Sequence, residues 1–175
     1  PYSTIVGNDL LPEVFLGRLS FDSQSHLQTI ISKTLNYESN PFMGENWFQR
    51  ACLVGDPSTS GVSCVITNNN IKEVLELHGY DDIRTVYSGS FPNQMTSNLS
   101  DGLGFFNYRG YYGVSGFNSS DVNSTNNGFM LPIATVITCG TGSFGGEESL
   151  IEAFLRAGTA SNPKGSVACI GTATL

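Results

Sequence analysis

Short apolar runs alternate with amphipathic stretches along this chain, and this alternation limits its fold more than any other feature. Such runs suit buried strands, while apolar residues spaced three and four apart suit helices. Strands that alternate with helices form a parallel sheet covered by helices. The predicted strands are residues 13–17, 50–54, 83–87, 102–107, 131–138 and 165–171; the predicted helices are 22–38, 67–79, 147–157 and a short helix or turn at 93–101.

Composition fits one globular domain and argues against a membrane span and against nucleic acid as the main partner. The 175 residues are 39% hydrophobic and 13% charged, and no apolar run is long enough to span a membrane. A net charge of −7 with three lysines argues against nucleic acid as the main partner. The acidic, lysine-poor surface, rich in Asn, Ser and Gly, favours a secreted or cell-surface protein. Because the chain begins at Pro1 and stops in a strand-like run, we expect it to be a piece of a longer protein.

Three loops should meet at the carboxyl edge of the sheet, where open α/β proteins bind ligands. They are residues 56–63, 108–117 and 139–146. Charge and aromatic groups gather in them, namely Asp56, Arg109, Tyr111, Tyr112 and Cys139. We therefore expect the loops 108–117 and 139–146 to lie side by side.

Cys139 is the candidate nucleophile, because it sits where a buried strand ends and a glycine-rich turn begins. Backbone amides and a following helix N-terminus would stabilise a thiolate there. Gly140 and Gly142 allow close backbone approach and can present N–H groups to an oxyanion. The alternative is that Cys139 is a small, inert core residue. Cys52, Cys64 and Cys169 lack the paired spacing of zinc ligands, and we expect at least two of the four cysteines in buried strands.

A dinucleotide site is the competing interpretation of the same turn. Glycines 140, 142 and 145 match the spacing of the phosphate-binding fingerprint. However, residues 166–174 lack the acid expected at the end of the next strand, and Glu147 and Glu148 at the helix start would repel a phosphate. We expect no cofactor; whether a structural calcium ion binds stays open.

Neither histidine is well placed as a general base. His26 falls within the first helix, and His78 in the last turn of another, where it complements the helix dipole. A cysteine nucleophile usually works with a base.

Several segments, in the same order over nearly the whole chain, resemble the gingipain-type cysteine peptidases, family C25. They are residues 12–20, 33–38, 105–110, 139–144, 152–157 and 165–168, among them Phe105-Phe-Asn-Tyr-Arg-Gly110 and Cys139-Gly-Thr-Gly-Ser-Phe144. The resemblance implies a caspase-like three-layer α/β sandwich, with a mostly parallel sheet and helices on both faces. Residues 1–175 would form a catalytic subdomain without its first strands.

The resemblance also assigns roles. Cys139 matches the family's nucleophile, and the backbone amide of Cys139 matches one of the two donors that bind the oxyanion. The family's Gly-His-Gly turn, which supplies the base and the second donor, corresponds here to Gly110, Tyr111 and Tyr112, so that a tyrosine replaces the histidine. Asp56 matches the acid that orients the histidine. The acid that sets arginine preference in some members falls near Cys64, across a loop of different length, so arginine specificity is not carried over.

Two functions follow from this resemblance. The first is a cysteine peptidase acting on peptide or protein substrates, with an altered base, because a phenol with an ordinary pKa of about 10 is a poor base near neutrality. Arg109 could then stabilise a Tyr111 or Cys139 anion, or instead pair with Asp56. The second is an inactive pseudopeptidase that serves as a binding or structural module of a surface protein.

Overall fold

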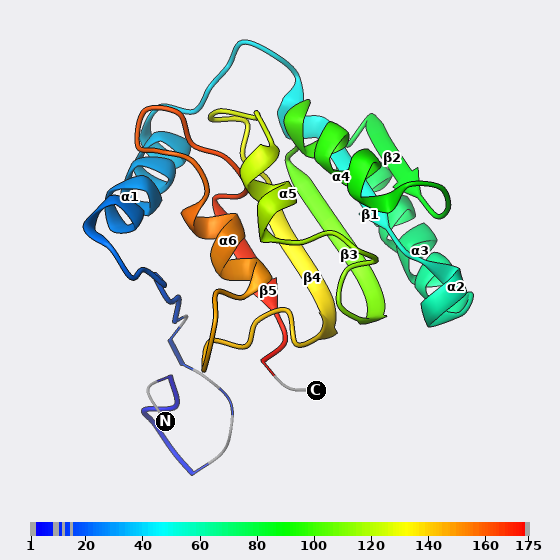
Figure 1. The fold of residues 1–175 in the computed structure, drawn as a ribbon, viewed down its shortest axis with the longest axis horizontal. Helices are drawn as coiled ribbons and strands as arrows, with labels where there is room; N and C mark the ends of the chain where they lie inside the picture. The colour runs from blue at the N-terminus through cyan, green and yellow to red at the C-terminus, as the bar shows by residue number, and fades with distance from the viewer. Residues whose placement is uncertain (1–2, 9–10, 12, 15, 174–175) are drawn as a thin grey trace.

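A five-stranded, wholly parallel sheet with the strand order β2-β1-β3-β4-β5 organises the protein (Figure 1). The computed structural model describes residues 3–8, 11, 13–14 and 16–173. The strands are β1 (Arg50–Val54), β2 (Asp82–Val86), β3 (Phe105–Tyr112), β4 (Ile133–Cys139) and β5 (Ala168–Gly171). The helices are α1 (Gln24–Ser39), α2 (Pro57–Ser60), α3 (Ser63–Leu77), α4 (Phe91–Ser100), α5 (Ser119–Ser124) and α6 (Leu150–Arg156), with a 3-10 turn at Trp47–Gln49.

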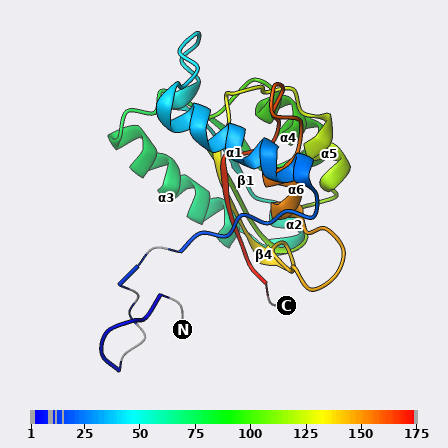
Figure 2. The same ribbon diagram turned by 90° about the vertical axis from the view of Figure 1, so that its left-hand side faces the viewer.

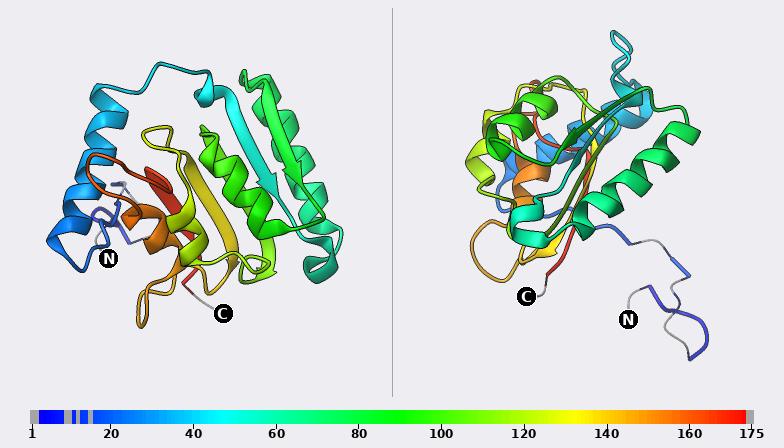
Figure 3. Two further views of the ribbon diagram at one scale, coloured as in Figure 1. Left: turned by 45° about the horizontal axis from the view of Figure 1, so that its top comes forward. Right: turned by 90° about the vertical axis from the view of Figure 1, so that its right-hand side faces the viewer.

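Helices cover both faces of the sheet, which makes three layers. Helices α4, α5 and α6 lie on one face, and α3 lies on the other (Figure 2, and Figure 3, right). Helix α1 packs against α6, beyond the edge strand β5. The α/β architecture predicted from the alternation of strands and helices is therefore confirmed.

The apolar core lies between the sheet and the α4–α6 layer. Strands β3 and β4 send alternate residues to this side, among them Phe106, Tyr108 and Val136, all fully or almost fully buried. Phe154 of α6 meets Phe106 at a ring distance of 5.8 Å. This packing fixes β3 and β4 side by side, and with them the residues at their carboxyl ends.

On the opposite face, buried polar side chains join α3 to the centre of the sheet. The amide of Asn68 donates to Val54 O at 2.9 Å, and Asn107 donates to Asn68 at 2.7 Å. Thr135 of β4 continues the series by donating to Asn107. Since a buried polar group without a partner is costly, this series fixes the position of α3 over β1 and β3.

The strand predicted at 13–17 is wrong for the residues described there. Residues 13, 14, 16 and 17 are irregular, and Phe15 lies outside the described residues. Strand β5 pairs with β4, and the segment does not join it. Instead, Leu16 and Gly17 line a hollow of about 300 Å³ together with Ile151 and Leu155 of α6. Leu16 stays 68% exposed beside this hollow, so the segment lies at the surface next to α6.

Several element boundaries also differ from the prediction, and three of the differences bear on the site. Strand β3 continues through Tyr112, where a loop was predicted from residue 108, because it keeps pairing with β4. Helix α3 begins at Ser63, four residues before the predicted start. Helix α6 begins at Leu150, because Ser149 and Glu152 form a capping box, so Glu147 and Glu148 precede the helix.

Candidate active site

The carboxyl edge of the sheet collects most of the predicted site residues. Because β1, β3 and β4 are parallel and adjacent, Asp56, the two tyrosines and Cys139 lie at the same edge of the sheet. Cys139 is the last residue of β4, half-buried, and Tyr112 of β3 is its Cα partner. The segments that end in Tyr112 and Cys139 therefore lie side by side, as predicted.

The turn after Cys139 is held by threonine hydroxyls. Thr141 donates to Val136 O and Thr138 O, each at 3.0 Å, and Thr172 also donates to Thr138 O. Gly140 has a φ of 77°, which favours glycine. The N–H of Gly142 already donates to Thr172 O at 2.8 Å. The chain therefore turns sharply behind Cys139 and leaves its thiol at the rim.

A β-bulge lies between Arg109 and Tyr112 at the end of β3. Arg109 pairs with Ile137, but Tyr112 pairs with Cys139, so β3 has one more residue than β4 between these two pairs. Gly110 lies within the bulge, and a Cβ there would come within 2.5 Å of the Tyr108 ring. A bulge changes the direction of the side chains that follow it.

Two hollows flank Cys139. One, of about 240 Å³, is lined by Tyr112, Val114, Phe117 and Leu150 as well as Cys139. The other, of about 290 Å³, is lined by Arg109, Tyr111, Ile137, Thr172 and again Cys139. Tyr111 and Tyr112, which are consecutive in β3, thus line different hollows beside the thiol. An extended chain laid across this edge could place a group on each side of Cys139.

Asp56 is buried at the end of β1, where it caps α2. Its Oδ1 accepts from Ser58 N at 3.0 Å and from the Ser58 hydroxyl, and its Oδ2 accepts from Ser115 Oγ at 2.8 Å. Burial opposes ionisation, but these hydrogen bonds outweigh it and hold the pKa of Asp56 below its ordinary value. The sequence analysis missed both serines; Asp56 before Pro57 is an N-cap signal that could have identified Ser58.

Asp56 is linked through Ser115 to Tyr108, not to Tyr111. Ser115 Oγ lies 2.8 Å from the hydroxyl of the buried Tyr108, whose pKa is raised mainly by burial. Tyr111, by contrast, is 73% exposed. The acid predicted to orient a base therefore contacts serines in the described structure.

Arg109 does not pair with Asp56. Its Nη1 donates to Gly110 O at 2.9 Å and to Ile137 O at 3.1 Å, and the side chain is exposed. These bonds hold the guanidinium over the end of β4, two residues before Cys139.

Both histidines lie outside the two hollows. His26 lies in α1, and its Nδ1 is 2.6 Å from Asp22, which precedes the helix. His78 Nδ1 lies 2.8 Å from Val74 O at the end of α3. Their predicted structural roles agree with these contacts.

All four cysteines are free thiols, in different environments. Burial raises the pKa of Cys52 and of Cys169 to about 12, so both stay protonated at neutral pH. Cys64, buried in α3, lies with Sγ 3.1 Å from Gly61 O. Cys139 alone among them lines the hollows at the carboxyl edge.

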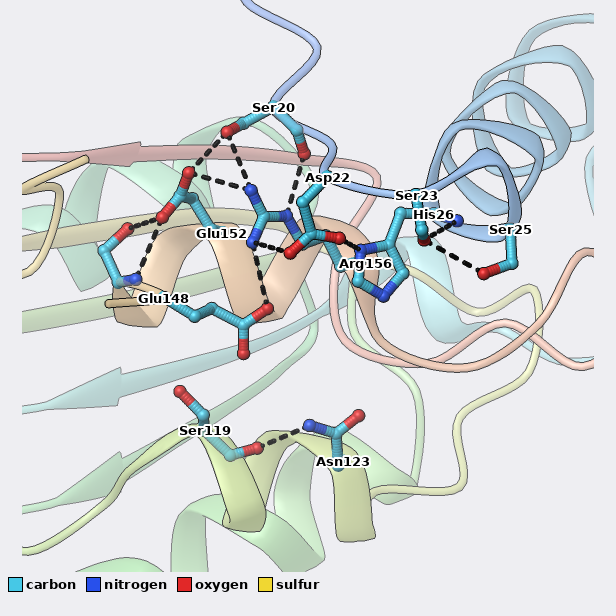
Figure 4. A network of polar contacts seen from close by, with 11 residues as sticks. Ser20, Asp22, Ser23, Ser25, His26, Ser119, Asn123, Glu148, Glu152 and Arg156 are labelled. Carbon is cyan, nitrogen blue, oxygen red and sulfur yellow. Dashed lines mark hydrogen bonds and ion pairs between the residues drawn. The ribbon is translucent and has the colours of Figure 1, made fainter. Parts of the chain in front are cut away.

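The start of α6 is occupied by a carboxylate of the chain itself. Glu152 Oε2 accepts from Ser149 N at 2.9 Å, and its other oxygen lies 3.0 Å from Arg156 (Figure 4). Burial opposes the charge, but hydrogen bonds from Ser20 and Ser149 and the attraction of Arg156 hold the pKa of Glu152 below its ordinary value. This helix start therefore offers little to a phosphate or to the Cys139 thiolate, which argues further against the dinucleotide interpretation.

The described residues contain no group of three or more His, Cys, Asp or Glu side chains arranged to hold a metal ion. Within that same part of the chain, no helix has the length and apolar character needed to cross a bilayer.

Comparisons with known proteins point to one family. A family model described as "Peptidase family C25" matches residues 1–175. Gingipain R2 of Porphyromonas gingivalis is 32% identical over 98% of this chain, and the match covers 25% of that protein. Lys-gingipain of the same organism is 29% identical over 61% of this chain and 6% of its own length.

Solved structures agree with the fold. The crystal structure of gingipain R, described as an Arg-specific cysteine proteinase, matches with a TM-score of 0.88 and 32% identity. That match covers 99% of this chain and 43% of the solved chain. A complex of the pro- and mature domains of RgpB from P. gingivalis gives a TM-score of 0.87. The caspase-like α/β fold is therefore confirmed, and the chain spans less than half of these relatives.

Proposed function

Because this chain belongs to peptidase family C25, we propose that it is the catalytic subdomain of a cysteine peptidase, with Cys139 as the nucleophile. The observation that carries the proposal is the position of Cys139 at the rim of β4, between two hollows. Peptides or proteins are the substrates. We extend the proposal to a longer protein at the cell surface or secreted, in keeping with the acidic, lysine-poor composition.

The chemistry requires a thiolate and two proton transfers. The thiolate of Cys139 attacks the scissile carbonyl, the amine leaves with a proton, and a thioester remains until water hydrolyses it. The amides of Cys139 and of Tyr112, its Cα partner on β3, are our candidates for holding the oxyanion. Gly140 provides the sharp turn that keeps the thiol at the rim.

The base is the altered part of this site. Tyr111 stands in the place of the family histidine and lines the hollow that contains Arg109 and Cys139. We propose the Tyr111 hydroxyl as the group that takes the place of that base in proton transfer. Since Asp56 is bound to Ser58 and Ser115, we expect Tyr111 to act without that carboxylate and the enzyme to be slow.

A pseudopeptidase is the second candidate, and the contacts of Asp56 favour it. Both oxygens of Asp56 accept hydrogen bonds from serines, an arrangement that holds two loops together without a base. In this case the two hollows beside Cys139 would bind a peptide without cleaving it.

The deciding experiment treats the full-length protein with a panel of peptidyl electrophiles and maps the adducts by mass spectrometry. Labelling of Cys139 that depends on the peptide and is lost in Cys139→Ala supports the peptidase. Labelling no faster than that of the buried thiols Cys52 and Cys169 supports the binding module. A peptide that protects Cys139 without being cleaved would do the same.

A further inference from the structure

The hollow that contains Arg109 sits directly beside the thiol. Arg109 is the Cα partner of Ile137, and Ile137 precedes Cys139 by two residues on the same strand. Residues two apart on a strand point to the same face and are about 7 Å apart. Arg109 therefore lies about one residue position along the sheet from the nucleophile, and both residues line the same hollow.

The guanidinium retains unused donors. An arginine has five N–H groups, and the two on Nη1 are accounted for by Gly110 O and Ile137 O. The edge formed by Nε and Nη2 makes no hydrogen bond to the described residues. That edge carries parallel donors in the geometry that binds both oxygens of a carboxylate.

No carboxylate of the described part of the chain supplies that partner. The lining of the hollow is Arg109, Gly110, Tyr111, Ile137, Thr138, Cys139 and Thr172, which includes no acid. Asp56, the candidate partner from the sequence, is bound to Ser58 and Ser115 instead. The hollow thus carries one positive charge beside the nucleophile and no compensating charge among these residues.

Size and lining also suit a short acidic side chain. The hollow measures about 290 Å³ and offers the apolar side chain of Ile137 beside the hydroxyl groups of Tyr111 and Thr172. A cationic side chain placed there would meet Arg109 as a like charge, which disfavours it.

We propose that the Arg109 hollow selects substrates with aspartate or glutamate at the residue whose carbonyl Cys139 attacks. The proposal rests on the proposed function, because it takes Cys139 as the nucleophile. Arg109 is then a specificity residue: its Nε and Nη2 bind the substrate carboxylate and position the adjacent carbonyl at the thiol.

The first arm of the test measures chemistry on the full-length protein. Peptidyl acyloxymethyl ketones that differ only at the last residue, Asp, Asn or Arg, are compared by their rate of adduct formation at Cys139. Charged hydrogen bonds predict that Asp reacts about 10- to 100-fold faster than Asn, and faster still than Arg. Arg109→Gln should abolish the difference between Asp and Asn, and Arg109→Glu should reverse the order of Asp and Arg.

A matched control removes a positive charge elsewhere. Arg18 is exposed and stacks over Phe144 at 4.3 Å, outside the Arg109 hollow. Arg18→Gln should leave the preference for Asp unchanged. Equal loss of preference in Arg18→Gln and Arg109→Gln would overturn the proposal, because general charge would then explain it.

The second arm does not depend on catalysis. Cys139→Ala protein, with and without Arg109→Gln, is titrated with peptide amides ending in Asp, Asn or Arg, and binding is measured by calorimetry. If no ketone reacts but the Asp peptide binds at least 10-fold more tightly through Arg109, the peptidase proposal fails and the acidic site stands. If the ketones react without a preference for Asp, or with a preference for Arg, the peptidase proposal stands and the acidic site is wrong.

Discussion

Asp56 accepts a hydrogen bond of 2.8 Å from the hydroxyl of Ser115. Ser115 has a φ of 46°, a conformation that residues other than glycine rarely adopt, so this bond helps to hold a strained loop. We expect Asp56→Asn to lower the free energy of unfolding by about 1–3 kcal/mol, since the amide keeps only one of the two oxygens that accept from Ser58 and Ser115. Urea unfolding measures it, and a double-mutant cycle with Ser115→Ala isolates the contact.

Asp56 should also make stability depend on acid. Because its pKa is lowered in the folded protein, its contribution is fully present above its ordinary pKa of 3.8 and is lost as pH falls through the folded value. Below pH 4 the stabilities of the native protein and Asp56→Asn should converge. A constant difference down to pH 2 would contradict this assignment of the pKa shift.

Restoring an imidazole at residue 111 should speed the chemistry. Histidine has an ordinary pKa of about 6.5, so Tyr111→His supplies a base near neutrality. We expect the labelling rate of Cys139 to rise at least about 10-fold, with a new inflection near pH 6–7. Labelling reactions quenched at set times across a range of pH measure this rate, with Tyr111→Phe as the control that removes only the hydroxyl. An unchanged rate in Tyr111→His would show that the bulge places residue 111 too far from the thiol.

The four thiols should differ in reactivity. Burial raises the pKa of Cys52 and Cys169 to about 12, while Cys139 lies half-buried at the rim. In the folded protein at pH 7.5, iodoacetamide should modify Cys139 at least about 100-fold faster than either. Peptide mapping after timed quenching gives the rates. In urea the difference should disappear, and a difference that persisted there would point to local sequence effects.

Lys33 gives a stability change in the opposite pH range. It is 1% exposed and donates to Phe154 O and Leu155 O, the last carbonyls of α6, at 3.0 and 2.7 Å. Burial lowers its pKa to about 7, with the nearby Cys169 thiol on β5 acting in the other direction. The unfolded state therefore binds more protons between pH 7 and the ordinary value of 10.5, and stability should rise with pH in that window.

The comparison with Lys33→Met measures this effect. From pH 7 to pH 9 the native protein should gain about 2 kcal/mol relative to Lys33→Met. Lys72→Met, at a more exposed lysine of α3, is the control and should follow the native protein. Parallel curves for the native protein and Lys33→Met would mean that Lys33 keeps its charge inside the fold.

Arg156 should be sensitive to conservative change. Its guanidinium binds Ser20 O, Ser20 Oγ and Glu152, and also reaches Asp22 and Glu148, so it joins the segment before α1 to α6 (Figure 4). Arg156→Lys keeps the charge but loses most of these bonds, and we expect a loss of about 2–4 kcal/mol, close to that of Arg156→Ala. Thermal unfolding compares the two variants. Full retention of stability in Arg156→Lys would show that the several hydrogen bonds of the guanidinium do not stabilise the fold.

The sequence predicted the parts of the fold that local pattern controls. The strand at 50–54 has the bounds expected for it, because Gly55 and Pro57 end an apolar run. The continuation of β3 through Arg109, Gly110 and Tyr112 was missed, because glycine and tyrosine side chains resemble a loop and only pairing with β4 makes them a strand. The segment 13–17 failed for the converse reason: its apolar residues resemble a strand, but no strand pairs with the residues described there, and Leu16 lines a hollow beside α6.

At the site, the sequence placed Cys139 at the end of a strand but did not give the partners of the polar groups. The pairing of Asp56 with Ser115 spans 59 residues, and no local spacing encodes it. The orientation of Arg109 toward Ile137 O likewise depends on the register between β3 and β4. Contacts of this kind depend on which residues of neighbouring strands are paired, so they can be predicted only once the register of the sheet is known.

The bulge between Arg109 and Tyr112 has a consequence for redesign of this edge. A substitution there changes which side chain is present, but the single additional residue of β3 determines which position meets Cys139. Deleting Gly110 would leave the same number of residues in β3 and β4 between these two pairs, so the bulge would close while Tyr112 stays opposite Cys139. Chain length at this point therefore sets how strongly the end of β3 bends, and point mutations, which keep that length fixed, leave this property of the edge unchanged.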